Sequence, residues 1–373
     1  MKKCIFHIPN HIEENAKSAP GIRPWKMLQA FRNIGYEVDA IMGYGKERRV
    51  AINKIKEKIK SGVKYEFMYS ESSTMPTTMT EKHHLPIYPD LDFGFFRFCK
   101  KHGIPIGLFY RDFYWKFDIY KDEVVVWKRI PATIAYKYDL GQYKKYLDKF
   151  YLPTKQGYQY LSECAMEDVL DALPPGSEYN EAVIQRRRQY INERQYNDGI
   201  CLFYVGGMSE VYGTEIFFEV ISTLPKIHLT FCCRKEEWME HEERYRKYLV
   251  NNIEVIHKSG AELVPYYEQA DICMVYQKPS LYTGFSISYK TFEYLANGIP
   301  SIASNGTAIG EFVKKHDIGW SIDYDTVTLK ELLCHILKHP KEIADKTENC
   351  LQEVKQQTWE CRAKKVKNDL KRG

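Results

Sequence analysis

Long apolar runs are missing from this 373-residue sequence, and no segment has the apolar length that a bilayer-spanning helix needs. The N-terminus, MKKCIFHIP, begins like a secretion signal, but His7 and Pro9 interrupt its apolar run before it reaches signal length. The ten cysteines form no C-x-x-C pair, and several fall inside apolar segments, which is typical of reduced thiols. These absences predict a soluble cytoplasmic protein.

Signatures of several cofactor and metal sites are also missing. No G-x-G-x-x-G follows an expected strand, which argues against a nicotinamide or flavin enzyme. The glycine-lysine pair at 45–46 is followed by Glu47 instead of Ser or Thr, so there is no P-loop. Asp90 and Asp92 form a D-x-D pair, but it follows Pro89 and opens an apolar helix, where Asp90 is expected to be the helix cap. We therefore expect no cofactor and no metal site.

Positive charge exceeds negative charge only slightly in this sequence. The chain has 54 Lys and Arg against 49 Asp and Glu, a net charge of +5, which is too small to indicate nucleic acid as a partner. It is compatible with an anionic membrane surface or a phosphorylated substrate. Residues 93–116 are rich in aromatic and basic side chains, and residues 362–372 form a basic tail. We expect these two segments to allow peripheral contact with the cytoplasmic face of a membrane.

What the sequence does contain is two successive series of short apolar strands alternating with helical patterns. Such alternation predicts an α/β fold with parallel sheets, and a chain of this length predicts two domains. Open parallel sheets bind ligands outside the carboxyl ends of their strands, so the functional residues are expected in the loops after strands. Strands are expected at 3–8, 36–42, 65–69 and 104–110, and then at 200–205, 227–233, 253–256, 272–276 and 300–303.

The most informative stretch is SISYKTFEYLANGIPSIA at 286–303. A polar loop leads directly into a short helix, whose first turn exposes backbone N–H groups that favour an anion. Lys290 adds a positive charge beside this helix start, and Glu293 can accept hydrogen bonds from the two hydroxyls of a ribose. The pattern predicts a nucleotide site, although Lys290 as a solvated helix-start residue and Glu293 as an ordinary first-turn acid are the alternatives.

The string K-x-x-E-Y-L-A-x-G-x-P at 290–300 resembles the nucleotide-sugar motif of GT-B glycosyltransferases, especially family 4 and its capsule and exopolysaccharide relatives. More weakly, residues 204–209 resemble the glycine loop that opens the C-terminal domain, and residues 103–112 resemble the acceptor face of the N-terminal domain. Trp359 with Arg362 resembles the closing helix of the family. The resemblance implies an α/β fold of GT-B type, with two facing Rossmann-like domains and a cleft between them.

On this basis we expect four segments along the chain. Residues 1–175 would form the acceptor-binding Rossmann-like domain, and a polar stretch at 176–199 would form a linker. Residues 200–355 would form the Rossmann-like domain that binds the nucleotide sugar. Residues 356–373 would form a helix that crosses back to the N-terminal domain.

The sequence departs from the family pattern at several positions. The family often has a first glutamate eight positions before the one matched by Glu293, and Phe285 stands there instead. The glycine loop of the family usually carries Arg and Lys for the diphosphate, whereas this chain has Gly207 and Tyr212. The His-Asp turn of the family becomes Arg-Asp at 111–112. The positive charge for the diphosphate must therefore come from elsewhere, and the Arg-Lys pair at 234–235 directly follows a strand.

The expected site residues fall into three overlapping groups. The donor-binding group is Gly206, Gly207, Arg234, Lys235, Ser288, Tyr289, Lys290 and Glu293. The acceptor-binding group is Gly21, Arg23, Arg111 and Asp112. The catalytic group is Arg234, Lys290, Asp112 and His11, the first two for charge on the leaving phosphate and the last two as bases if the reaction inverts configuration.

The resemblance implies a metal-independent glycosyltransferase that retains configuration. Its donor would be a nucleoside-diphosphate sugar, and its acceptor a glycan or lipid-linked glycan in the synthesis of capsule, exopolysaccharide or another cell-surface polysaccharide. Two alternatives remain open at this point. One is a nucleotide-sugar 2-epimerase of the same fold, and the other is a non-catalytic partner subunit, suggested by Phe285 and by the uncharged glycine loop.

Overall fold

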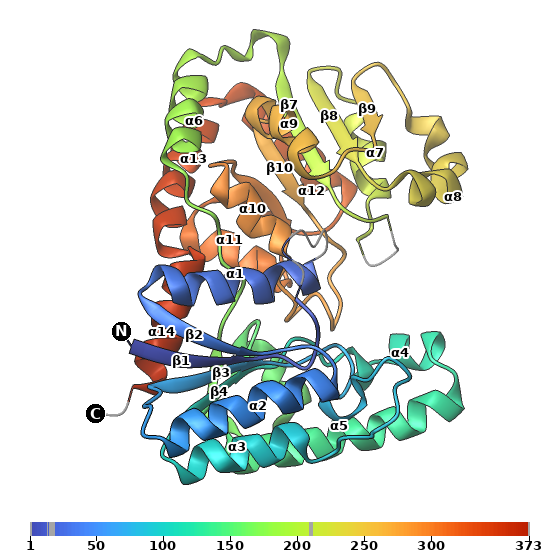
Figure 1. Cartoon of the computed structure of the whole chain (residues 1–373). Coiled ribbons are helices and arrows are strands. Elements are labelled where there is room, and N and C mark those ends of the chain that lie inside the picture. Colours follow the sequence, from blue (N-terminus) through green and yellow to red (C-terminus); the bar gives the residue numbers. More distant parts are fainter. Residues whose placement is uncertain (1, 13, 15–18, 209–211, 372–373) are drawn as a thin grey trace. The chain divides into compact units, whose positions relative to one another are not determined.

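The computed structural model describes residues 2–371 except 13, 15–18 and 209–211. The chain divides into two compact units. The first unit is Met1–Pro175 together with Trp359–Gly373, and the second is Gly176–Thr358. Each unit contains one six-stranded parallel sheet covered by helices (Figure 1).

The sheet of the first unit has the strand order β2-β1-β3-β4-β5-β6, and all of its pairs are parallel. Its middle strands, at 67–71 and 106–109, are buried along their length; the second is apolar throughout, whereas the first ends in the buried polar residues Ser70 and Glu71. Its strands are β1 (Lys2–His7), β2 (Tyr36–Ile41), β3 (Phe67–Glu71), β4 (Ile106–Phe109), β5 (Lys149–Leu152) and β6 (Leu170–Ala172).

Helices cover both faces of this sheet. Figure 1 shows α1 and α14 on one face, and α2, α3 and α5 on the other. The helices of the first unit are α1 (Ala19–Asn33), α2 (Gly45–Lys60), α3 (Leu91–Lys101), α4 (Asp118–Glu123), α5 (Val126–Tyr146) and α14 (Trp359–Leu370).

Helix α1 carries two of the predicted acceptor-binding residues. It starts at Ala19 and includes Pro24. Gly21 and Arg23 therefore lie in helix α1 and not in a loop. Pro24 lies in the second turn of this helix, where it removes one N–H donor from the intrahelical hydrogen bonds.

The sheet of the second unit has the order β12-β11-β10-β7-β8-β9 and is also parallel throughout. Read from its other edge, this is the doubly wound order in which the chain starts in the middle and winds outward in both directions. Its strands are β7 (Ile200–Val205), β8 (Ile227–Cys232), β9 (Ile253–Ile256), β10 (Ile272–Val275), β11 (Ser301–Ser304) and β12 (Gly319–Ile322).

Two apolar clusters form the core of the second unit, one on each face of the sheet. Ile200 and Leu202 of β7 belong to the cluster that includes residues of α7 and α12, whereas Phe203 of the same strand belongs to the cluster that includes residues of α10 and α13. This alternation follows from the two-residue period of a strand. The helices of this unit are α6 (Glu181–Glu193), α7 (Glu215–Ile221), α8 (Lys235–Tyr245), α9 (Val264–Gln269), α10 (Tyr289–Ala296), α11 (Ala308–His316), α12 (Thr326–Lys338) and α13 (Lys341–Glu353).

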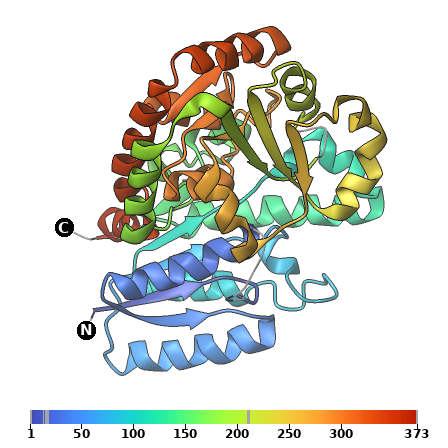
Figure 2. The same ribbon diagram turned by 90° about the horizontal axis from the view of Figure 1, so that it is seen from above.

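The segment 176–199, which we expected to be a linker, carries helix α6 and belongs to the second unit. Figure 2 shows α6 beside α13. Its charged side chains are used inside the fold: Arg187 is buried and donates to the Ala270 carbonyl at 2.7 Å, and Arg194 pairs with the fully buried Asp271 at 3.0 Å. The polar composition therefore reflects internal hydrogen bonds and not a solvated connection.

The last helix, α14, packs on the first unit although it follows the second in sequence. Trp359 and Val366 are buried there, and Arg362 Nε donates to the carbonyl oxygens of Pro174 at 3.2 Å and Pro175 at 3.1 Å. The basic segment expected at 362–372 lies in this helix up to Leu370, residue 372 is outside the described residues, and contact of the segment with a membrane remains a prediction.

The aromatic segment 93–116 begins with phenylalanines that lie inside the first unit. Phe93, Phe95 and Phe96 of α3 are fully buried and pack in the core of the first unit. Among the described residues, no helix combines the length and the apolar character that crossing a membrane requires.

Candidate functional site

The strand order of the second unit defines where a ligand can bind. β7 and β10 are neighbours in the sheet, and the helices that follow them, α7 and α10, pack in the two opposite core clusters. The chain therefore leaves these two strands toward opposite faces, which opens a crevice at their carboxyl ends. The loop after β7 contains Gly206 and Gly207, and the loop after β10 leads to Ser288.

Helix α10 begins at this edge. Ser288 is its N-cap residue, and the Ser288 hydroxyl accepts the backbone N–H of Lys290 at 3.2 Å. One turn later the buried Tyr294 hydroxyl accepts the backbone N–H of Val205, the last residue of β7, at 3.1 Å. This contact joins helix α10 to the end of β7, directly before the glycine loop. Burial raises the pKa of Tyr289 at the first helical position, and Glu293 raises it further.

Lys290 and Glu293 form an ion pair. Lys290 Nζ lies 2.8 Å from Glu293 Oε2, and both side chains are about one-third exposed (32% and 26%). The pair closes one helical turn on the exposed side of α10. Glu293 also reaches toward the core, where burial and this carboxylate together raise the pKa of the Tyr267 phenol. The structure thus brings the two predicted residues together, and their opposite charges compensate each other.

Hydrogen bonds within the second unit hold the glycine loop after β7. The Tyr204 hydroxyl donates to the Gly207 carbonyl at 2.7 Å, and a Cβ on Gly206 would lie only 2.5 Å from that hydroxyl oxygen. Glu237 of α8 accepts the backbone N–H of Met208 at 3.2 Å. Gly206 therefore makes room for a tyrosine of the same strand, which is the structural reason for a glycine at this position.

Arg234 and Lys235 stand at the start of α8, directly after β8. Both are exposed, and Arg234 pairs weakly with Glu237 at 3.3 Å while 77% of its side chain remains exposed. Burial is the main cause that raises the pKa of Tyr212, and Glu237 raises it as well, whereas Arg234 lowers it. Arg234 therefore lies near enough to Tyr212, in the loop after β7, to affect its pKa, and most of its side chain is exposed.

Sequence reasoning missed Lys278, which follows β10. Its Cβ lies 3.3 Å from the position that a Cβ on Gly213 would occupy, so it is next to the loop after β7. Within the described part of the chain, Lys278 has no acidic partner within ion-pair distance, unlike Lys290 and Arg234. The available signal was its position two residues after an expected strand.

Phe285 occupies the position of the first family glutamate. Its side chain is 3% exposed and packs against the Tyr282 ring at 5.3 Å between centroids. An apolar ring in this place leaves no carboxylate for a donor sugar. Phe285, which departs from the family pattern, is therefore packed into the fold.

In the first unit the structure brings two predicted arginines together around a carboxylate. Glu71 ends β3, is fully buried, and lies 3.4 Å from Arg23 Nε and 3.3 Å from Arg111 Nη2. The Tyr69 hydroxyl donates to the same carboxylate at 3.0 Å, and burial raises the pKa of this phenol well above its usual value. Burial lowers the pKa of Arg111, and Glu71 opposes that shift. Both arginines therefore contact the same buried carboxylate.

Glu71 was not among the predicted residues. It follows the strand expected at 65–69 by two residues, where functional residues were expected, and a charged residue at that position was the signal that could have identified it. The guanidinium of Arg23 also stacks on Phe109, with its central carbon 3.5 Å from the ring centroid. Its Nη1, although buried, has no hydrogen-bond partner among the described residues.

The other predicted residues of the first unit lie apart from this cluster. Asp112 follows Arg111, and its carboxylate accepts the backbone N–H of Tyr114 at 2.9 Å, which closes a turn. His11 contacts α2 instead: its Nε2 lies 3.1 Å from Glu47. No contact between His11 and Asp112 is present in the part of the chain that the structure describes, so the two candidate bases occupy separate places.

The acids of the D-x-D pair have different partners. Asp90 precedes α3 and accepts Arg97 Nη2 at 2.7 Å in place of a backbone N–H, so it caps the helix by position only. Asp92 is buried between His7 Nε2 at 2.8 Å and Arg48 Nε at 2.9 Å. Burial favours a raised pKa for Asp92, but the contacts with His7 and Arg48 outweigh it and hold the pKa below its usual value. Across the described residues, no group of three or more His, Cys, Asp or Glu is arranged to hold a metal ion.

Known proteins resemble the chain in two ways: a family model matches part of its sequence, and solved structures share its whole fold. Residues 199–352 match the family model described as Glycosyl transferases group 1. Sucrose-phosphate synthase from Thermosynechococcus elongatus superposes with a TM-score of 0.61 at 16% identity, covering 98% of this chain and 97% of that chain. A glycosyltransferase from Rickettsia africae gives 0.61 at 12% identity, covering 99% and 98%. HepE of Anabaena, solved with UDP-glucose, gives 0.57 at 10% identity, covering 97% and 98%. No curated protein matches the chain significantly.

The chain has two parallel six-stranded sheets with helices on both faces, which is the GT-B architecture. These solved structures match nearly the whole length of the chain. Within it, residues 199–352 identify a glycosyltransferase domain. The chain therefore has the fold and the domain of a transferase, as its sequence predicted.

Proposed function

We propose that the protein transfers a glycosyl group from a nucleoside-diphosphate sugar to an acceptor hydroxyl. The observation that carries this proposal is the start of α10, where Lys290 and Glu293 lie at the carboxyl edge of the sheet and Tyr294 joins the helix to β7. The match of residues 199–352 to group 1 glycosyl transferases and the fold shared with HepE, solved with UDP-glucose, support the choice of donor class.

In this proposal the start of α10 binds the nucleotide. The Glu293 carboxylate would accept hydrogen bonds from the ribose hydroxyls, and Lys290 with the N–H groups of the first turn would hold the diphosphate. Because Lys290 and Glu293 neutralise each other, donor binding would exchange their ion pair for two contacts with the ligand. Ser288, Tyr289 and the loop with Gly206 and Gly207 would line the same place.

The reaction breaks the bond between the anomeric carbon and the β-phosphate oxygen, and the electron pair goes to that phosphate. Lys290, Arg234 and Lys278 carry positive charge at this edge of the sheet, with Lys235 beside them, and would stabilise the leaving group without a metal. The acceptor oxygen bonds to the anomeric carbon, and its proton passes to the departing phosphate oxygen or, if the reaction inverts, to a base. We propose retention of configuration, from the resemblance to family 4; inversion would need a base, for which Asp112 and His11 are the candidates.

For the acceptor we propose the cluster at the carboxyl ends of β3 and β4. Arg23 and Arg111 share the one carboxylate of Glu71, and Arg23 Nη1 is a buried donor still without a hydrogen-bond partner in the described structure. Gly21 and Asp112 lie next to these arginines in sequence. The polar, positive character suits the hydroxyls and acidic groups of a glycan, and we propose a glycan or lipid-linked glycan of a capsule, exopolysaccharide or other cell-surface polysaccharide.

A panel of UDP-, GDP- and dTDP-sugars, followed by calorimetry on the sugars that raise the melting temperature, tests donor binding. Lys290→Ala and Glu293→Gln should each weaken donor binding about tenfold, the effect of losing one charge-assisted hydrogen bond. Arg246→Ala is the matched control, because Arg246 is an exposed, ion-paired cation that follows α8 and precedes β9, at the opposite edge of the sheet. Equal affinity in all three variants would remove the proposed site.

A non-catalytic partner subunit is the second candidate, favoured by the buried Phe285 in place of an acid. Binding of a donor without release of nucleoside diphosphate in the presence of cell-surface glycan acceptors would support it. Formation of an epimerised nucleotide sugar without any acceptor would instead identify a nucleotide-sugar 2-epimerase.

A further inference from the structure

The first unit exposes a concentrated apolar surface on helix α5. Of the seventeen large hydrophobic side chains that the described residues expose, six fall within residues 125–138, whereas the others are scattered along the chain. We call these six the α5 stripe: Val125, Val126, Trp127, Ile130, Ile134 and Tyr138. Trp127 is 72% exposed and Ile134 is 64% exposed, so these side chains lie in solvent along their length.

The stripe follows from the helical repeat of α5. Val126, Ile130, Ile134 and Tyr138 recur every four residues and lie along one side of the helix. Its opposite side is buried in the unit through residues such as Tyr136, which stacks on Trp115 at 4.9 Å between ring centroids. The helix is therefore apolar on two sides, and only one of them has a partner within the unit.

Positive charges accompany the stripe. Helix α5 carries five cations and a single acid, Asp139. Asp139 is buried, accepts the backbone N–H of Thr77, and has its pKa raised mainly by burial. The exposed charge of α5 is thus entirely positive. Its cations are Lys128, Arg129, Lys137, Lys144 and Lys145.

The acids nearby belong to α4 and to a neighbouring turn, and ion pairs with lysines compensate part of their negative charge. Asp118 pairs with Lys121 at 2.6 Å, and Glu163 pairs with Lys116. Asp122 and Glu123, the last acids before the stripe, are exposed and reduce the local positive charge without cancelling it.

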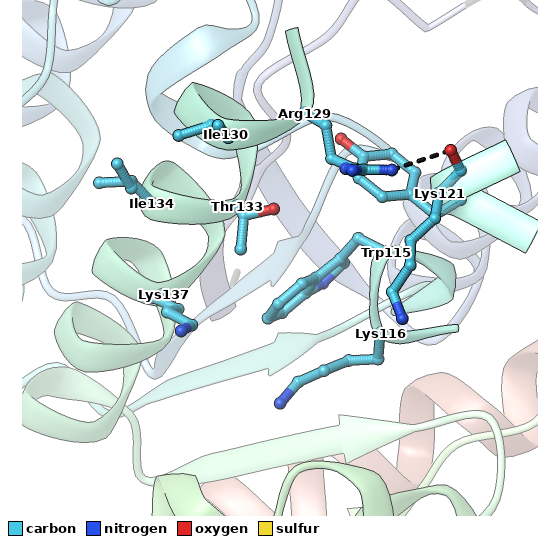
Figure 3. Close-up of a pocket in the computed structure, with 9 residues that line it drawn as sticks. Trp115, Lys116, Lys121, Arg129, Ile130, Thr133, Ile134 and Lys137 are labelled. Atoms are coloured by element: carbon cyan, nitrogen blue, oxygen red, sulfur yellow. Dashed lines mark hydrogen bonds between the residues drawn. The ribbon is translucent and has the colours of Figure 1, made fainter. Parts of the chain in front are cut away.

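Between α4 and α5 the surface is hollowed (Figure 3). The hollow has a volume of about 440 Å³ and is lined mainly by apolar atoms. Figure 3 shows Ile130, Ile134 and Thr133 on α5, with Trp115 opposite them and the amino groups of Lys116, Lys121 and Lys137 around the opening. Arg129 is held here by a hydrogen bond to the Lys121 carbonyl at 2.8 Å. An apolar floor with a cationic rim suits a ligand with an apolar part and an anionic head.

We propose that the α5 stripe docks on the surface of a membrane that contains anionic lipid, with the stripe among the upper acyl chains and the cations at the headgroups. A helix that lies in a membrane interface typically carries apolar side chains, including tryptophan, flanked by Lys and Arg, and α5 has this pattern. A second copy of the chain is the weaker partner, because two such faces would oppose like charges. This inference does not rest on the proposed transfer reaction.

Vesicle flotation tests it with the full chain. The protein should float with phosphatidylcholine vesicles that contain 30 mol% phosphatidylglycerol and stay behind with pure phosphatidylcholine. The triple variant Trp127→Ser, Ile130→Ser, Ile134→Ser should lose at least about tenfold in partition coefficient, and so should Lys128→Glu with Lys137→Glu. The matched control, Val50→Ser with Val327→Ser, removes equally exposed apolar side chains elsewhere and should float like the wild type.

All variants change exposed positions, so melting temperatures close to the wild-type value are the check on folding. Failure of the wild type to float with anionic vesicles overturns the proposal, and so does equal flotation of the triple variant. Self-association that the triple variant abolishes, without any vesicle binding, would assign the stripe to a second copy and would also overturn it. Donor binding measured on the same variants should be unchanged, which separates this result from that of the proposed function.

Discussion

At the scale of single residues, the buried carboxylate of Glu71 has the largest consequences in the first unit. It compensates part of the charge of Arg23 and Arg111, both of which are mostly buried. We expect Glu71→Gln, which keeps the shape, to lower the free energy of unfolding by about 3 kcal/mol, because it removes the buried anion that both arginines contact. Urea unfolding followed by fluorescence measures this loss.

Glu37→Gln provides the control for that change. Glu37 pairs with Lys3 at the surface, with 45% of its side chain exposed, so its loss should cost no more than about 0.5 kcal/mol. Donor affinity should stay unchanged in both variants, because both residues lie in the first unit. Similar unfolding free energies for the two variants would contradict the special role of Glu71.

At the scale of elements, helix α14 is held on the first unit partly by Asp171 of β6, which pairs with Lys365 and with Lys155. Burial favours a raised pKa for Asp171, but the two lysines and the Ala172 N–H outweigh it and lower the pKa to about 2. A depressed carboxyl pKa contributes stability that is present above the unfolded value near 4 and is lost as the pH falls toward 2.

We therefore expect Asp171→Asn to lower the free energy of unfolding by about 1 kcal/mol at pH 6, a value suited to a partly exposed ion pair. At pH 2.5 the difference between variant and wild type should shrink to less than half. Urea unfolding at the two pH values measures it. Asp168→Asn, an exposed acid just before β6, is the control and should show little effect at either pH. A pH-independent difference for Asp171→Asn would contradict the assigned pKa.

At the scale of the whole molecule, each unit has its own parallel sheet, and the cations of the proposed donor site belong to the second unit alone. Because Lys290, Arg234, Lys278 and a helix N-terminus provide the positive charge, we expect EDTA to leave the rate of nucleoside-diphosphate release within about twofold of the untreated rate. A loss of activity that Mg²⁺ or Mn²⁺ restores would show that the leaving phosphate needs a metal.

Much of the second unit could be predicted from its sequence. The strands expected at 200–205 and 253–256 are those of β7 and β9, and the short helix expected within residues 286–303 is α10. Strands β5, β6 and β12 were not expected. They have only three or four residues, too few for a clear apolar pattern, and they form because a neighbouring strand supplies their hydrogen bonds.

The candidate site could be predicted in part. Lys290 and Glu293 lie one helical turn apart, so local geometry alone brings them together. Lys278 and Glu71 were missed because their importance depends on neighbours distant in sequence. Glu71 meets Arg23 and Arg111, 48 and 40 positions away, only after the sheet has formed (71 − 23 and 111 − 71).

By itself, the sequence determined the alternation of strands and helices, the division into two α/β halves and the helix start that carries the nucleotide motif, because these depend on contacts within a few residues. Only the tertiary structure decided which polar groups are buried, as with Arg187 in a segment that resembled a linker. It also decided which side of α5 stays uncovered. An apolar side chain shows no preference among apolar partners, so its burial depends on whether the rest of the chain reaches it.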